Sequence, residues 1–432
     1  MTPGAPFDDT IFALSSGQPP AAIAIVRISG PNASVALTAL SAGLPEPRRA
    51  TLATLRDPAG GMVLDRALTL FFPGPETATG EDLAELHLHG GRAVVAAVER
   101  ALSALPKLRR AEPGEFTRRA FAHGRMDLAE AEGLSDLLIA ETEGQRRNAM
   151  ALADGTLSRA IRRWRTELID AAAAIEARID FADEDDVPDD DGGSAPTLAR
   201  VRAEIASMLV VPPAERLRDG IRVVIAGPPN SGKSTLFNAL IGKEAAIATP
   251  LPGTTRDLIE YPVQIGGIPF IFVDSAGLRE TEDKIEAIGV ERAREAIGGA
   301  DLVLWMGEPD DDAFHEAIIV HGRSDLPERA RPPTNVDVAV SAKTGLGMAE
   351  LQALIVSRGT SLLPREGEIA LGQRQREALT DCLAALIEAP ISDILLLSES
   401  LRAARASLDR LTGEGGVEPL LDAIFAQFCI GK

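Results

Sequence analysis

The chain has 432 residues, which is long enough for about three domains of roughly 150 residues each. Hydrophobic residues make up 45% of it, and no apolar run approaches the roughly 20 residues that a membrane helix requires. The first residues lack the basic and apolar regions of a secretory signal, and two cysteines, Cys382 and Cys429, argue against a disulfide framework. These features predict a globular cytoplasmic protein with no membrane part.

The net charge of −20 argues against a protein that coats nucleic acid, because attraction to phosphate requires a basic surface. A polynucleotide partner would therefore need local basic patches. Two arginine-rich segments qualify, at 109–125 and 159–165, although a solvated helix face is the favoured interpretation of each taken alone.

In chain order, residues 1–118 combine short β-like runs, such as 22–26 and 68–72, with short helical stretches and Gly/Pro turns. This pattern predicts a small α+β domain. Residues 119–216 are helical, with apolar side chains such as Ile161, Trp164 and Leu168 spaced by three or four.

From 217 to 362, β-rich runs alternate with helical ones, which is typical of a parallel sheet with crossover helices. Residues 363–432 return to helix, with Leu401 and Leu408 on one apolar face. The predicted fold is therefore multidomain α/β and α+β, with an α/β module inserted in a discontinuous helical domain. Such a module could move the helical domain, provided that the helical segments on its two sides pack together.

The α/β module carries a phosphate-binding motif. The strand 221–226 leads into Gly227-Pro-Pro-Asn-Ser-Gly-Lys-Ser234, which matches G-x-x-x-x-G-K-[ST], and a helix is predicted to follow. Lys233 would reach the terminal phosphates and Ser234 would ligate Mg²⁺. Backbone groups of the same loop and helix would hold the nucleotide, at Asn230, Ser231, Gly232 and Thr235.

Two further elements sense the γ-phosphate in P-loop GTPases. Thr255 lies in Gly253-Thr-Thr-Arg-Asp257 and is predicted to complete the Mg²⁺ shell. Asp274 and Gly277 form a D-x-x-G after the strand 269–273, so Asp274 would hold the metal through water and the Gly277 amide would face the γ-phosphate.

Base recognition departs from the usual N-K-x-D, because the chain reads Gly322-Arg-Ser-Asp325. Asp325 can still accept hydrogen bonds from the guanine N1–H and amine, and Arg323 can stack on the base. Gly322, however, lacks the amide that usually ties this loop to the P-loop. A loop predicted to close over the base follows at Ser341, Ala342 and Lys343. The motifs together predict a GTPase with guanine preference and weakened affinity.

Six further motifs lie outside the α/β module: Val26-Arg-Ile-Ser-Gly-Pro31, Thr79-Gly-Glu-Asp82, Glu85-Leu-His-Leu-His-Gly-Gly91, Pro113-Gly-Glu-Phe-Thr117, Asp127-Leu-Ala-Glu-Ala-Glu132 and Phe428-Cys-Ile-Gly-Lys432. With these motifs and the nucleotide motifs, the whole chain resembles the MnmE (TrmE) family of tRNA wobble-uridine modification GTPases.

This resemblance implies an N-terminal domain that binds a tetrahydrofolate derivative, in the 5,10-methylene or 5-formyl form, and that forms a homodimer. It implies four folate contacts, at Arg27, Glu85, Arg125 and Lys432, where position 125 is Lys in the family pattern. Cations suit the folate carboxylates, and Glu85 suits the adjacent N–H donors of a pterin. Surface ion pairs are the alternative for each residue.

The resemblance also implies potassium as a fixed charge near the transferred phosphate, with ligands from Asn230, Thr249, Leu251 and Thr254. It implies that Glu286 orients the attacking water and that Cys429 acts on the uridine, although a buried inert thiol is an equal interpretation of Cys429. The implied partners are tRNA and MnmG, an FAD-binding subunit, and the implied product carries an aminomethyl-type group at C5 of uridine 34.

Two other functions remain open. A ribosome-assembly GTPase of the Era or Der type would share the nucleotide motifs, but it would carry a KH-like domain or a second P-loop, and the sequence contains neither pattern. A folate-binding scaffold whose altered base loop has abolished nucleotide switching would fail to bind GTP.

Overall fold

The computed structural model describes residues 7–180, 194–228, 230–242, 260–273, 298–307, 317–388, 393–414, 418–426, 428 and 431. The chain divides into two compact units. One consists of Met1–Ser135, Leu152–Glu184 and Pro390–Lys432, and the other of Asp136–Ala151 and Asp185–Ala389. The predicted domain boundaries after residues 118, 216 and 362 stay predictions.

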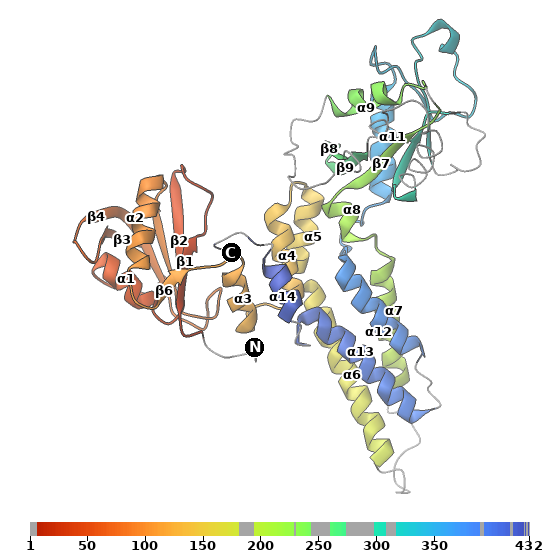
Figure 1. The fold of residues 1–432 in the computed structure, drawn as a ribbon. Coiled ribbons are helices and arrows are strands. Elements are labelled where there is room, and N and C mark those ends of the chain that lie inside the picture. The colour runs from red at the N-terminus through yellow and green to blue at the C-terminus, as the bar shows by residue number, and fades with distance from the viewer. Residues whose placement is uncertain are drawn as a thin grey trace, which may run out of the picture. The chain divides into compact units, whose positions relative to one another are not determined.

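The first unit contains a sheet with the strand order β3-β4-β5-β2-β1-β6 (Figure 1). Its strands are β1 (Thr10–Leu14), β2 (Ile23–Ser29), β3 (Thr51–Arg56), β4 (Val63–Phe72), β5 (Leu83–His89) and β6 (Leu108–Arg110). Neighbouring strands are antiparallel, except that β1 and β6 are parallel. α1 (Ala33–Ser41) and α2 (Arg92–Ser103) pack on one face, as the predicted α+β domain requires.

Alternation along the strands decides which side chains meet these helices. Ala24, Val26 and Ile28 of β2 are fully buried against α1 and α2. Arg27 therefore points to the opposite face of the sheet, where its direct partner in the register is Glu85 of β5. We call this opposite face, which carries Arg27 and Glu85, the open face.

The helices of the first unit include a long pair, α6 (Thr156–Asp180) and α13 (Ile394–Thr412), which run side by side (Figure 1). The predicted apolar positions Ile161, Trp164, Leu168, Leu401 and Leu408 are each at most 1% exposed. α3 (Glu115–Ala122) and α14 (Glu418–Phe425) also belong to this unit, and α4 (Leu128–Ile139) and α5 (Glu143–Ala153) contribute to both units.

The second unit contains a sheet with the order β12-β11-β10-β7-β9-β8. Its strands are β7 (Ile221–Ala226), β8 (Glu260–Ile265), β9 (Ile268–Val273), β10 (Leu302–Trp305), β11 (Ile318–His321) and β12 (Val338–Ala339). All neighbouring pairs are parallel except β8 and β9. α9 (Lys233–Ile241) and α11 (Met348–Ser361) supply buried side chains to its core.

The remaining helices of this unit are α7 (Ser194–Val210), α8 (Ala214–Arg218), the 3₁₀ turn η3 (Pro327–Arg329) and α12 (Gln373–Glu388). α7 packs beside α12, and Arg376 of α12 donates hydrogen bonds to the carbonyl oxygens of Leu209 and Val211, at 2.7 and 2.9 Å. Helices that precede the α/β part thus pack on helices that follow it, in both the α6–α13 and the α7–α12 pairs. This packing is what an inserted module requires.

Candidate functional site

The P-loop begins where the central strand β7 ends. Gly227 and Gly232 have φ values of 145° and 104°, which only glycine adopts readily. α9 begins directly afterwards, so its first backbone N–H groups are available to an anion. Lys233 Nζ donates hydrogen bonds to the carbonyl oxygens of Gly227 and Pro228, both at 2.8 Å, which holds its ammonium beside the loop. Ser234 is exposed on the first turn of the helix.

The segments that follow β10, β11 and β12 meet beside the P-loop because all four follow parallel strands at the same edge of the sheet. Together they form a pocket of about 230 Å³. Its lining comes from the P-loop and α9, from Met306 after β10, from the loop after β11 and from the loop after β12. The pocket therefore contains these predicted nucleotide contacts: Ser231, Gly232, Thr235, Arg323, Asp325, Ala342 and Lys343.

The base-recognition loop, residues 321–329 from the end of β11 through η3, contains the predicted base-recognition residues 322–325. A hydrogen bond with Ser341 holds the pKa of Asp325 below its usual value, with further stabilisation of the charged form by Lys343 and Arg323. Asp325 is therefore a carboxylate at neutral pH, the form that accepts from guanine. Ser341 itself is fully buried, so it fixes Asp325 from below the surface.

Two contacts close the base-recognition loop on itself. Arg329 Nε donates to the carbonyl oxygen of Gly322 at 2.9 Å, and His321 Nε2 lies 2.9 Å from the carbonyl oxygen of Arg329. Arg323 has a φ of 61°, which is unusual for a residue other than glycine. Its Nε lies 3.5 Å from where a Cβ on Gly232 would be, so the side chain lies near the P-loop and lines the pocket, and its stacking on the base stays a prediction.

Asn230 is exposed on the P-loop and has a φ of 63°. The other predicted potassium ligands, Thr249, Leu251 and Thr254, lie outside the described residues. The same holds for the predicted nucleotide-sensing residues Thr255, Asp274 and Gly277, for Glu286, and for Cys429 and Lys432 near the C-terminus.

A second group of predicted residues lies on the open face of the first sheet. Arg27 Nη2 donates to Glu85 Oε1 at 2.9 Å, and His87 Nε2 lies 3.2 Å from Glu85 Oε2. Burial alone would raise the pKa of Glu85, but the hydrogen bonds with Arg27 and His87 outweigh burial and lower that pKa. The side chains of Arg27 and Glu85 remain 28% and 16% exposed, so a ligand can reach this charged pair.

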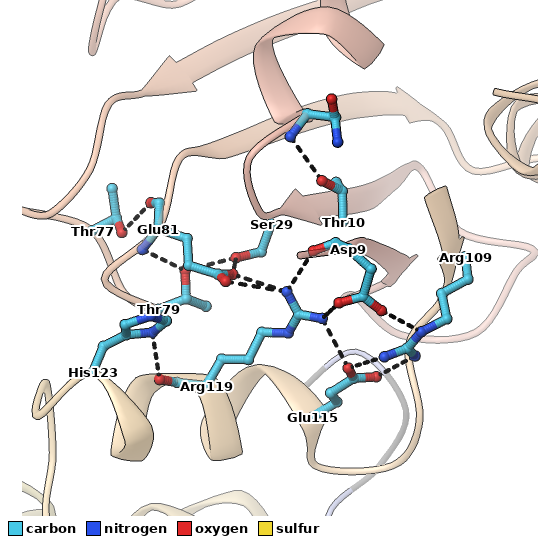
Figure 2. Close-up of polar contacts among 11 residues, drawn as sticks. Asp9, Thr10, Ser29, Thr77, Thr79, Glu81, Arg109, Glu115, Arg119 and His123 are labelled. Carbon is cyan, nitrogen blue, oxygen red and sulfur yellow. Dashed lines mark hydrogen bonds and ion pairs between the residues drawn. The ribbon is translucent and has the colours of Figure 1, made fainter. Parts of the chain in front are cut away.

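A buried ionic network fixes the loop next to this pair, and Figure 2 shows Arg119 of α3 pointing into it. Arg119 is fully buried and bonds three carboxylates, with Nη1 3.1 Å from Glu81 and Nη2 2.7 Å from Asp9 and 3.1 Å from Glu115. Ser29, two residues beyond Arg27 on the open face, donates to Glu81 at 2.7 Å. The prediction that the segment 109–125 is a solvated helix face is thus wrong for Arg119, because three carboxylates replace its water.

The same network places Arg125. α3 ends at Ala122, and a turn then brings Arg125 to the loop that Glu81 anchors, where it lies 3.6 Å from Glu76. Gly80 makes this approach possible, since a Cβ there would lie 2.6 Å from His123 Cβ. Arg125 therefore lies beside loop 74–82. Glu85 lies on β5, which follows this loop, and Arg27 lies on β2, whose Ser29 donates a hydrogen bond to Glu81 of the loop.

The C-terminal tail reaches the strand next to Arg27. Ser15 Oγ donates to the carbonyl oxygen of Gly431 at 2.8 Å, and a Cβ on Gly431 would lie 2.1 Å from the Leu14 carbonyl oxygen. Phe425 and Phe428, both almost fully buried, anchor the tail in a cluster with Ala131. The residue that precedes Lys432 is therefore held at the end of β1, whose Ala13 pairs with Arg27.

Sequence reasoning does not single out Arg119, Glu81 or Met306. Glu81 does belong to the Thr79-Gly-Glu-Asp82 motif, which was an available signal. Arg119 belongs to the arginine-rich segment 109–125, but nothing local indicates its burial, because Asp9 and Glu81 are remote in sequence and only Glu115 is near. Met306 would have been found only from a prediction that β10, the strand before it, pairs with β7.

None of the helices in the described part of the chain is long and apolar enough to cross a membrane.

Two family models match the sequence: the GTP-binding protein TrmE N-terminus over residues 10–125, and the MnmE helical domain over residues 128–429.

Curated relatives align with the chain along its whole length. The tRNA modification GTPase MnmE of Rhizorhabdus wittichii is 56% identical over 435 residues, covering 100% of this chain and 98% of the relative. The tRNA modification GTPase MnmE of Novosphingobium aromaticivorans is 54% identical, covering 98% of this chain and all of the relative. That of Erythrobacter litoralis is 51% identical with the same coverage, 98% and 100%. The chain is a P-loop GTPase that acts in tRNA modification, and it belongs to the MnmE family.

Proposed function

We propose that this GTPase works with MnmG, an FAD-dependent partner, and uses a folate one-carbon unit to install an aminomethyl-type group at C5 of wobble uridine 34 of tRNA in the cytoplasm. The observation that carries the folate part of the proposal is the Arg27–Glu85 pair. It presents an anionic carboxylate and a cation side by side on an accessible sheet face.

The chemistry of the available side chains suits a folate. Arg27, Arg125 and Lys432 are cations that can bind the carboxylates of the folate tail, and Glu85 can accept from adjacent N–H groups of the pterin. His87 holds the second oxygen of Glu85 and so orients that carboxylate. A bound 5,10-methylene- or 5-formyl-tetrahydrofolate would supply the one-carbon unit, and these residues would bind and orient it.

Titration of the full-length protein with 5-formyltetrahydrofolate, followed by calorimetry, tests the folate site. We expect Arg27→Ala and Glu85→Gln each to weaken binding about tenfold or more, because each removes a charge-assisted hydrogen bond. Arg100→Ala is the matched control, since Arg100 is an exposed arginine on α2, which covers the opposite face of the sheet. Equal affinity in all variants, or an equal loss in the control, would refute the assignment.

For GTP hydrolysis, we propose that Lys233 and Mg²⁺ bind the terminal phosphates, with Ser234, Thr255 and Asp274 holding the metal. Gly277 would sense the γ-phosphate, and Glu286 would orient the attacking water. Potassium would add a fixed positive charge at the bond being broken, held by Asn230 with Thr249, Leu251 and Thr254. The exposure of Asn230 on the P-loop supports this role, because its side chain is free to turn towards an ion.

Steady-state GTP hydrolysis in potassium and in sodium buffer of equal ionic strength tests the role of potassium. We expect faster turnover in potassium, and Asn230→Ala should abolish that difference. Asn238→Ala is the control, because Asn238 is an exposed asparagine on α9 away from the loop. Equal slow rates in both salts for the unmodified protein would rule out potassium activation here.

We also propose a homodimer through the open face. Ile23, Leu52 and Leu68 are 58%, 69% and 44% exposed, and the strand register places all three on the face that carries Arg27 and Glu85. Neighbouring exposed apolar side chains are typical of an interaction surface. In sedimentation velocity, Leu52→Asp with Leu68→Asp should yield a monomer. Leu44→Asp, at an apolar position 47% exposed in the loop after α1, should not. A monomeric unmodified protein would refute the dimer.

Cys429 is assigned to direct chemistry on the uridine. Cys429→Ser should keep the rate of GTP hydrolysis and lose tRNA modification when MnmG, folate and tRNA are supplied. Retained modification would identify Cys429 as an inert thiol.

A further inference from the structure

Met306 lies at the meeting point of three glycines in the nucleotide pocket. It follows β10 directly, its backbone N–H donates to the Ala226 carbonyl oxygen at 2.8 Å, and its side chain is only 5% exposed. A Cβ on Gly227 would lie 3.1 Å from Met306 Cβ, and one on Gly232 would lie 3.7 Å from Met306 Cε. A Cβ on Gly322 would lie 2.5 Å from Met306 Cε, closer than real Cβ contacts come. The methionine methyl therefore occupies the space that a side chain at residue 322 would take, and as the end of a flexible side chain it would be displaced by one.

Position 322 is also where glycine replaces the asparagine of N-K-x-D. A Cβ there would lie 3.2 Å from the Ser231 carbonyl oxygen, so a side chain at 322 would point towards the P-loop. An asparagine in this place could hydrogen-bond the P-loop backbone. Here the Met306 methyl takes the space instead, packed against the base-recognition loop at Gly322 and facing the P-loop at Gly232.

We propose that Met306 joins the base-recognition loop to the P-loop in place of the missing asparagine, and so is an affinity-determining residue for the guanine nucleotide. The link is the packing of a thioether methyl in the space between Gly322 of the base-recognition loop and Gly232 of the P-loop. Met306 also lines the pocket itself, together with Arg323 and Asp325. A flexible thioether fills an irregular gap of this kind well, because it can adjust its shape to the two loops.

The rest of the loop is built to keep this contact. Arg329 holds the Gly322 carbonyl oxygen, and Val340 donates its N–H to the His321 carbonyl oxygen at 2.8 Å, so the backbone on both sides of the contact is fixed. Gly322 has no left-handed φ, unlike Gly227 and Gly232. Its backbone would thus accept an alanine, and the chief obstacle to one is Met306.

A double-mutant cycle on the full-length protein tests the contact, with affinity for a fluorescent GDP analogue as the measurement. Gly322→Ala should weaken binding several-fold, because its Cβ would displace the flexible Met306 methyl from between the two loops. Met306→Leu conserves volume but has no atom in the place of Cε, so it should weaken binding several-fold by removing the link. In the Met306→Leu background, Gly322→Ala should then change affinity by less than about twofold, because its Cβ has room.

Met348→Leu is the matched control for the cycle. Met348 is a buried methionine at the start of α11, in the same hydrophobic core but outside the pocket. In the Met348→Leu background, Gly322→Ala should keep its full penalty. Met306→Leu with Gly322→Asn should bind more tightly than Met306→Leu alone, because the asparagine can now reach the P-loop.

The proposal depends on GTP binding by the pocket, and the cycle separates the two ideas. An unmodified protein that does not bind the GDP analogue would refute nucleotide binding itself. An unmodified protein that binds, with a Gly322→Ala penalty that is absent or is the same in the Met306→Leu background, would overturn only the role of Met306. Thermal unfolding of each variant by circular dichroism confirms that affinities are compared between folded proteins.

Discussion

Arg119→Met should be one of the most damaging single substitutions in the first sheet and its surroundings. The change keeps a long apolar side chain but removes the cation that three carboxylates share. Glu81 and Glu115 have side chains only 7% and 9% exposed, so water cannot replace the lost partner. Arg109 still bonds Asp9 and Glu115, at 2.6 and 2.5 Å, which leaves Glu81 as the carboxylate with no cation among the network's described residues.

Breaking a buried ion pair by removing one partner costs about 3–5 kcal/mol, and we expect the lower end because Arg109 compensates at two of the three carboxylates. Differential scanning calorimetry of the full-length protein would give the loss of stability. Hydrogen exchange measured by mass spectrometry would locate it at β1, α3 and loop 74–82. Arg110→Met is the matched control. Its side chain is 64% exposed and pairs with Glu99, so its loss should cost less than about 1 kcal/mol.

The reasoning also predicts a rescue. In the Arg119→Met background, Glu81→Gln should restore part of the stability, because it neutralises the carboxylate that lost its cation. A loss below about 1 kcal/mol for Arg119→Met, or no recovery with Glu81→Gln, would refute the idea that this network holds loop 74–82 in place.

Three further predictions concern the same sites. Hydrogen bonds from arginines outweigh burial and lower the pKa values of Asp9 and Glu115, as they do for Glu85. The stability that these groups provide is therefore complete at neutral pH, and it is lost as the pH falls below about 4, through their folded-state pKa values. Circular dichroism would follow the acid unfolding, and unfolding that began near pH 6 would contradict this prediction. Asp325→Asn should weaken GDP binding about tenfold or more and favour the xanthine nucleotide. The asparagine amide can donate to the xanthine carbonyl, which stands where the carboxylate accepted from the guanine amine. An unchanged preference in competition binding would exclude Asp325 from base recognition. Gly431→Ala should weaken folate binding and leave GDP binding unchanged, because its Cβ would overlap the Leu14 carbonyl oxygen and displace the tail; calorimetry with both ligands would show whether only one is affected.

Much of the nucleotide site was predictable from the sequence because its determinants are local. The strand β7, the two P-loop glycines and the start of α9 follow one another within residues 221–241, and the motif spacing specifies them. The periodicity of apolar residues likewise predicted the α6 and α13 faces, because a helix repeats its burial every three or four residues. Arg27 and Glu85 were predicted only through the family resemblance, and the register of β2 and β5 pairs them on one face of the sheet.

The tertiary structure decided the contacts between residues far apart in the chain. Nothing in the local sequence connects Arg119 with Asp9 and Glu81, which are separated from it by 110 and 38 residues. The space that Gly322 leaves open is filled by Met306, because β10 lies between β7 and β11 in the sheet. A sequence motif records which side chain is missing from a loop, but only the order of the strands determines which neighbour takes its place.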